Sequence, residues 1–134
     1  NAADTVRASR LSEEERGGPE HTAWEAEIRR LIGIRHRHLV PRLDRIGRGR
    51  AERPVDDLLT VRWPLGDGQA WTMMLCTAAS EVSGVVRPDG ELVATSSPGV
   101  EGALEAGRFP RWTAAVFLTG ADPEEFADTP PPQR

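Results

Sequence analysis

The pattern of apolar and polar residues changes once along the chain, from a helical period to an alternating one. In the first part, apolar residues recur close to helical spacing at Trp24, Ile28, Leu31, Ile32 and Leu39. Pro19 stands where a first helical residue often stands, Glu20 follows in the first turn, and Pro41 stops the pattern. The sequence therefore predicts a helix over residues 19–38.

The period changes to two after an Arg- and Gly-rich stretch. Apolar runs separated by turn residues predict strands at 58–65, 69–78, 81–87, 91–96 and 112–119. A short helical turn is expected around 98–106. Several short strands at this spacing are typical of an antiparallel sandwich or a small barrel. We expect a mainly β protein: an antiparallel β-sandwich preceded by one long N-terminal α-helix.

These patterns divide the chain into five parts. A flexible lead-in is expected at residues 1–18, followed by the helix at 19–43 and an Arg/Gly-rich connector at 44–55. The β-sandwich is expected at 56–120. Residues 121–134 end in DTPPPQR and lack the apolar content of a core, so we expect a disordered tail there.

Residues 58–78, LLTVRWPLGDGQAWTMMLCTA, predict a hairpin with one tryptophan in each strand. If Gly66-Asp67-Gly68 forms a three-residue loop, Trp63 lies opposite Trp71 and one face of the hairpin is almost wholly apolar. A two-residue turn would instead place Trp63 opposite Thr72 and move Trp71 to the other face. We prefer the first register because it separates apolar from polar side chains better, although the second strand is apolar on both faces.

The tryptophans then have two interpretations. In the preferred register the hairpin pair lines up with four other apolar side chains, Leu59, Val61, Met73 and Leu75. Such a stripe is typical of a core, where large aromatic side chains contribute most. Alternatively, Trp63, Trp71 and Trp112 are candidates for binding a sugar substrate by stacking. We favour the core interpretation for the hairpin pair, and a core anchor or lid for Trp112.

Composition limits the classes of function. The chain has 134 residues, a formal charge of −4 and a pI near 5.4, which argues against a nucleic-acid binder. Its one cysteine, Cys76, excludes an internal disulfide and a Cys-based zinc site. No stretch approaches the roughly eighteen apolar residues of a membrane span, and no signal-peptide pattern opens the chain. We therefore expect a cytoplasmic protein without a membrane partner.

The residues themselves predict no catalytic centre, metal site or cofactor. His36 and His38 lie two positions apart on a helix and point about 200° apart, so they cannot chelate one metal ion. Gly47-Arg48-Gly49 lacks the preceding strand and following helix that a nucleotide-binding loop needs. The acidic residues lie mainly at turns and strand edges, where nothing predicts a convergent carboxylate pair.

Three stretches together resemble a known family: PEHTAWEAEIRRLIGIRHRHLVPRL (19–43), DDLLTVRWPLGDG (56–68) and GRFPRWTAAVFL (107–118). In the same order, they are similar to the carboxyl end of the malto-oligosyltrehalose trehalohydrolases, members of the alpha-amylase superfamily (glycoside hydrolase family 13). The resemblance covers most of the chain. It departs at Cys76-Thr77-Ala78-Ala79, where the family commonly has an Asn-Leu-Ser-Asp-like stretch.

The resemblance implies that the helix corresponds to the last helix of a (β/α)8 catalytic barrel and that a C-terminal β-sandwich follows it. The family hydrolyses the α-1,4 bond that joins trehalose to a maltooligosaccharide, without a cofactor. Its nucleophile and general acid belong to the barrel, so no catalytic residue carries over to this chain. The chain begins at Asn1, and we expect it to be a non-catalytic domain of a longer hydrolase that supports the barrel.

Four apolar residues of the predicted helix, Trp24, Ile28, Leu31 and Ile32, form an interaction face that we call the helix stripe. Without a barrel the helix stripe lacks part of its partner. We expect it to fold onto the sandwich, pair with another copy or remain exposed, and we favour a helix-mediated homodimer. Two alternatives to a supporting domain remain: a free-standing module that binds α-glucan, and a protein-interaction module that acts through the helix.

Overall fold

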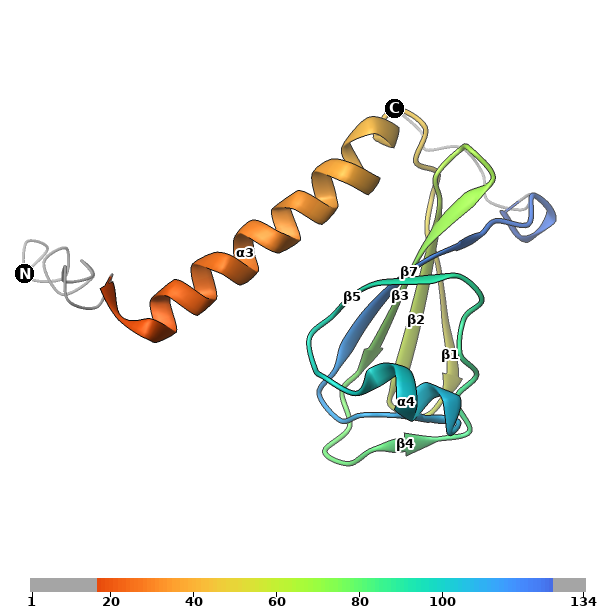
Figure 1. Cartoon of the computed structure of the whole chain (residues 1–134). Coiled ribbons are helices and arrows are strands. Elements are labelled where there is room, and N and C mark those ends of the chain that lie inside the picture. Colours follow the sequence, from red (N-terminus) through yellow and green to blue (C-terminus); the bar gives the residue numbers. More distant parts are fainter. Residues whose placement is uncertain (1–16, 127–134) are drawn as a thin grey trace, which may run out of the picture.

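The computed structural model describes residues 17–126, and Figure 1 shows a long helix beside a small β domain. The elements in chain order are α3 (Pro19–His38), η1 (Val40–Arg42), β1 (Arg50–Val55), β2 (Leu58–Pro64), β3 (Gln69–Cys76), β4 (Val82–Ser83), β5 (Glu91–Thr95), α4 (Val100–Glu105), β6 (Arg108–Phe109), β7 (Ala114–Gly120) and η2 (Glu124–Phe126). The predicted fold class, mainly β with one long helix near the N-terminus, is confirmed for these residues. Residues 1–16 and 127–134, most of the predicted lead-in and tail, lie outside them.

Helix α3 begins and ends where the sequence predicts. Pro19 lies in the first turn, where its missing N–H removes no helical hydrogen bond, and Glu20 faces the positive end of the helix dipole. Basic residues occupy the last turn, where the dipole favours positive charge: Arg35, His36, Arg37 and His38. None of the helix residues is buried, so the described chain covers little of α3.

Five antiparallel strands form the main sheet in the order β1-β2-β3-β7-β5, and β4 pairs with β6 in a separate two-stranded ribbon. Strand β1 lies within the stretch that the sequence predicts to be a connector. Its residues are exposed except for Val55, because β1 is an edge strand with little to bury. The connector between α3 and the sheet is therefore shorter than predicted, and ends before Arg50.

The hairpin formed by β2 and β3 has the preferred register. Trp63 pairs with Trp71 and Val61 pairs with Met73. The backbone N–H of Leu65 donates to the carbonyl of Gln69 at 2.9 Å, which closes the three-residue loop Gly66-Asp67-Gly68. The alternative register, with Trp63 opposite Thr72, is excluded.

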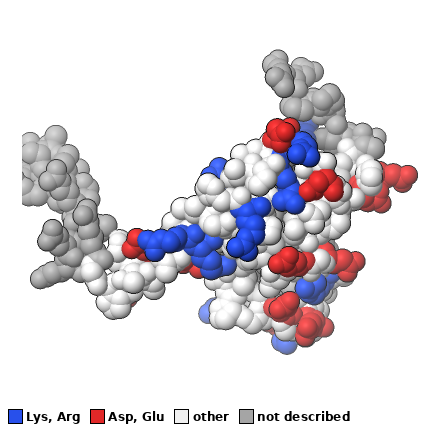
Figure 2. Space-filling model, turned by 45° about the horizontal axis from the view of Figure 1, so that its top comes forward, with Lys and Arg blue, Asp and Glu red and all other residues white. Residues whose placement is uncertain are grey.

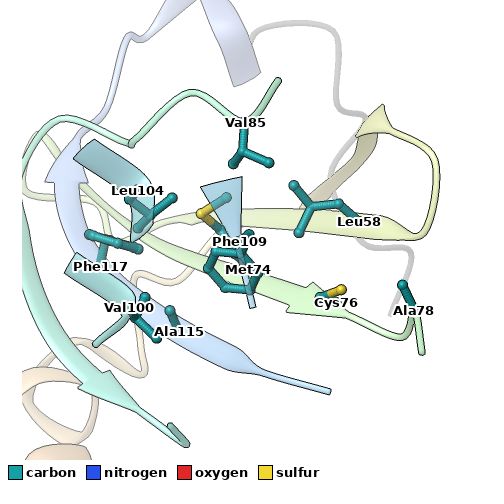
Figure 3. Packing of buried hydrophobic residues seen from close by; sticks show 10 residues of the cluster. All are labelled: Leu58, Met74, Cys76, Ala78, Val85, Val100, Leu104, Phe109, Ala115 and Phe117. Carbon is teal, nitrogen blue, oxygen red and sulfur yellow. The ribbon is translucent and has the colours of Figure 1, made fainter. Parts of the chain in front are cut away.

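The hydrophobic core lies on the other face of this hairpin, and the prediction that the tryptophan stripe forms the core is wrong. We call the face that carries the core the inner face, and the face that carries Trp63 and Trp71 the outer face. Helix α4 and the β4–β6 ribbon cover the inner face (Figure 3). The cluster comprises Leu58, Met74, Cys76, Ala78, Val85, Val100, Leu104, Phe109, Ala115 and Phe117. Cys76 is buried within it, as a small apolar side chain.

Part of the predicted disordered tail is instead attached to the sheet. Residues 124–126 form η2, and Nη1 of Arg62 donates to both carboxylate oxygens of Glu125 at 2.6 Å. Arg50 also donates to the backbone carbonyl of Glu125 at 2.8 Å. These bonds bring residues 121–126 into the domain through charged contacts, which an apolar pattern does not reveal.

Candidate docking surface

The outer face of the sheet presents a broad set of apolar side chains that are only half-buried. Trp63 and Trp71 form its cross-strand pair near the hairpin loop. The remaining members lie on β2, β3 and β7: Leu59, Val61, Met73, Leu75, Ala114, Val116 and Leu118. Every one of these residues has intermediate burial, whereas their inner-face neighbours on β3 and β7 are fully buried.

The end of α3 and the segment between α3 and β1 together cover part of the two tryptophans. The ring of His38 lies 6.2 Å from the Trp71 ring, measured between centroids. Gly49 lies so close to Trp63 that an added Cβ would overlap the indole nitrogen. A hollow of about 290 Å³ remains beside them, lined by Leu39, Ile46, Trp63, Leu65, Trp71 and Met73. The hairpin tryptophans are thus neither core residues nor an open platform.

The end of α3 is clamped to the hairpin loop by one arginine. The Arg42 guanidinium donates to the Asp67 carboxylate at 2.6 Å, to the Gln69 side chain at 2.9 Å and to the His38 carbonyl at 2.7 Å. The hydrogen bond from Arg42 lowers the pKa of Asp67 below its ordinary value, although partial burial opposes the shift. This clamp joins the end of α3 to the hairpin loop.

From this clamp α3 runs past β5 and away from the domain (Figure 1). A second hollow, of about 200 Å³, lies between the helix and the outer face; Glu27 and Leu31 line it on the helix side and Ala114 and Val116 on the sheet side. The rest of the helix stripe is not covered by the described chain. Exposed fractions are 64% for Trp24, 46% for Ile28, 40% for Leu31 and 51% for Ile32. Four large apolar side chains on one helix are typical of an interaction site.

Trp112 does not join the hairpin tryptophans. It precedes Ala114, which pairs with Leu75, whereas Trp71 pairs with Leu118 four residues further along β7. At about 3.3 Å per residue, Trp112 therefore lies at the opposite end of the sheet. It is 65% exposed, so it is not the core anchor that the sequence suggested. Its φ of 50° is uncommon for a bulky residue.

Charge is segregated along α3. Residues 19–28 contain three glutamates and no arginine, and residues 29–38 contain four arginines and no acidic residue. Ion pairs join the two halves, from Arg29 to Glu25 and from Arg30 to Glu27, each at 2.7 Å. Because of its hydrogen bond from Arg30, the pKa of Glu27 is lowered. In Figure 2 the arginines form a band across the visible face that acidic side chains border, so the surface is not uniformly basic.

The described residues offer no arrangement for metal chemistry. Within residues 17–126, no three His, Cys, Asp or Glu side chains are grouped so that they could hold a metal ion. Over the same range, no helix combines the length and apolar character that crossing a membrane requires. The feature that stands out is therefore the apolar surface made by the helix stripe and the outer face.

Comparison with known proteins gives no relative: no protein-family model, no curated protein and no solved structure matches the chain.

Two parts of this surface were not expected from the sequence. Leu39 and Ile46 cover the tryptophan pair, although they lie at the edge of and within the Arg-rich connector region. The signal that could have identified them is that they are isolated apolar residues in a polar stretch. Gly49 gave no such signal, because its role depends on the position of Trp63.

Proposed function

We propose that this chain is a non-catalytic accessory domain of a glycoside hydrolase that resembles the malto-oligosyltrehalose trehalohydrolases. Its role is to support the catalytic (β/α)8 barrel, which would release trehalose by hydrolysing an α-1,4 bond. The observation that supports this proposal is the half-covered apolar outer face next to an exposed helix stripe. Stable interfaces between domains of one chain bury such apolar surfaces. The catalytic barrel is proposed as the partner because three stretches of the sequence resemble this family.

When the barrel is absent, the distribution of charge along α3 favours pairing with a second copy of this chain. If two copies of α3 pack antiparallel through their helix stripes, the acidic half of each lies beside the basic half of the other. Such a pair is the helix-mediated homodimer expected from the sequence. Binding of α-glucan through the tryptophans has weaker support, because Trp112 lies apart from the other two and both of those are half-covered.

The proposal predicts that the gene continues upstream of Asn1 with enough codons for a barrel, typically about 250 residues. That upstream polypeptide and the present chain, produced separately, should hydrolyse maltooligosyltrehalose when mixed, whereas this chain alone should not. Ile28→Glu in the helix stripe should weaken their association by more than roughly tenfold, because a buried unpaired charge is costly. Ala26→Glu is the control, since residue 26 points about 200° away from residue 28 on the helix.

Three results would contradict the accessory role: a gene without an upstream barrel, hydrolysis by this chain alone, or equal effects of the two substitutions. Light scattering after size exclusion reports the homodimer. Titration with maltohexaose, followed by tryptophan fluorescence, tests the glucan-binding alternative, and we expect no change in emission. A saturable change that is lost in Trp71→Ala would favour that alternative instead.

A further inference from the structure

The inner face of the sheet changes from apolar to polar halfway along the strands. Near the β7 start it carries apolar core residues, including Met74 and Ala115. Toward the hairpin loop the same face carries Thr60 and Arg62 from β2, Thr72 from β3 and Thr119 from β7. Burial of polar side chains costs free energy unless they are hydrogen-bonded, so a polar half-face is a feature that packing alone does not explain.

A pocket of about 330 Å³ lies over this polar half-face. Its floor is formed by the side chains of the three strands, and the turn at Pro88 and Asp89 forms part of its wall. This turn packs directly on the backbone of β7, since an added Cβ at Gly90 would overlap the carbonyl oxygen of Leu118. With its φ of 124°, Gly90 allows that close approach. The pocket has the size of a small-ligand site.

The hydrogen bonds on the floor are partly satisfied within the domain. The hydroxyls of Thr72 and Thr119, which are only 1% and 6% exposed as residues, lie 2.9 Å apart and bond to each other. Arg62 donates through Nη1 to Glu125 and through Nη2 to the carbonyl of Gly120 at 2.9 Å. Within residues 17–126, the hydroxyl of Thr60, the Nε of Arg62 and the carboxylate of Asp89 form no hydrogen bond of their own. These three groups are available to a ligand.

The charges of the pocket indicate a neutral ligand. An anion would approach the carboxylates of Asp89 and Glu125, and a cation would approach the guanidinium of Arg62. Arg62 is paired with Glu125. The pocket therefore offers threonine hydroxyls, one charged donor in Arg62 and one charged acceptor in Asp89. A molecule with several hydroxyl groups matches such a set, because each hydroxyl both donates and accepts.

We propose that this inner-face pocket binds a small, neutral polyhydroxylated molecule, of the size of a monosaccharide or cyclic polyol. Asp89 accepts hydrogen bonds from the ligand, Arg62 donates through Nε, and the Thr60 hydroxyl completes the contacts. The site is independent of the proposed docking role, because it lies on the face of the sheet opposite the tryptophans. One role can therefore fail without the other.

The test is a titration of the ¹⁵N-labelled 134-residue chain with glucose, with myo-inositol and, as charged comparisons, with phosphate and acetate. Amide shifts should change in saturable fashion at Thr60, Arg62, Thr72 and Asp89 with the two polyols, and not with the anions. Asp89→Asn keeps the shape but removes the charge, and should weaken binding by roughly tenfold, the effect of losing one charge-assisted hydrogen bond. Asp56→Asn, at an exposed turn, is its matched control and should leave the affinity unchanged.

A second pair of variants tests the hydroxyl floor. Thr60→Val replaces the available hydroxyl with a methyl group of similar size and should weaken binding severalfold, whereas Thr77→Val at an exposed position should have no effect. The amide spectrum of each variant shows whether the fold is retained. Three results would overturn the proposal: no saturable shift with either polyol up to the high millimolar range, a preference for phosphate or acetate, or polyol binding that neither Asp89→Asn nor Thr60→Val weakens.

Discussion

The two faces of the sheet are built from the same strands but are completed in different ways. The inner face of β3 is fully buried because α4 and the β4–β6 ribbon lie across it. The outer face of β3 is as apolar in sequence, with Trp71, Met73 and Leu75, but within residues 17–126 it is partly covered, by the end of α3 and the segment that follows it. The inner face is thus completed within the domain, and the outer face resembles half of an interface.

This difference shows that apolar content does not identify a core by itself. A residue reaches full burial only when another element of the chain covers it, and the loss of free energy on truncation follows the burial that is achieved. Half-buried apolar residues next to an exposed helix stripe are the observation on which the proposed docking role depends. The comparison of the faces can be tested directly, because adjacent residues on one strand point to opposite sides.

Met73 and Met74 are a matched pair for this purpose. Met74 is 1% exposed on the inner face, and Met73 has intermediate burial on the outer face. Met74→Ala should reduce the free energy of unfolding by about 2–5 kcal/mol, because a buried side chain is replaced by a cavity. Met73→Ala should reduce the free energy of unfolding by only about 1 kcal/mol, because its side chain is half-buried and loses less apolar contact on truncation. Urea unfolding of the two variants measures both values, and equal costs would remove the distinction between the faces.

Much of the fold was predictable because its local signals are strong. The bounds of α3 follow from its proline and its periodic apolar residues, and the hairpin register follows from its loop. Strand β1 was missed because an exposed edge strand is polar on both sides, and Pro54 within it reads as a break. The predicted strand at 81–87 is reduced to Val82–Ser83, where Gly84 with a φ of 76° ends it.

The choice of inner face could not be predicted in the same way. Residues on both sides of β3 are apolar, so alternation gives the register but not which side is covered. That choice depends on Val100, Leu104 and Phe109, which come from elements far along the sequence. The four residues of the helix stripe, in contrast, do lie on one helix and are all exposed, because helical spacing is a local property. Its partner is a property of another molecule or domain, and so stays a prediction.

Gly49 offers a way to sharpen the comparison on the outer face. Gly49→Ala places a methyl group against the Trp63 indole and should destabilise the chain by about 1–2 kcal/mol, as the half-buried indole shifts to make room. The emission spectrum of the tryptophans should change with it. The control is Gly102→Ala in α4, where an added Cβ meets nothing within 4 Å and a helical alanine is favourable. Unfolding curves that match for Gly49→Ala and the unaltered chain would mean that the connector does not cover Trp63.

The smallest expected effect concerns the clamp between α3 and the outer face. Arg42 lowers the pKa of Asp67, so the folded state binds the Asp67 proton less readily than the unfolded state. The resulting stability is fully present above the ordinary carboxyl pKa of about 3.9 and is lost as the pH falls through the lower pKa of the folded state. Its size should stay below about 1 kcal/mol, because the two side chains are 22% and 30% exposed and water screens the pair.

Arg42→Ala should therefore lower stability near neutral pH and flatten its decline between about pH 5 and pH 2, measured by urea unfolding at each pH. If that decline is as steep in Arg42→Ala as in the unaltered chain, the clamp does not hold α3 against the hairpin, and the cover of the outer face has another origin.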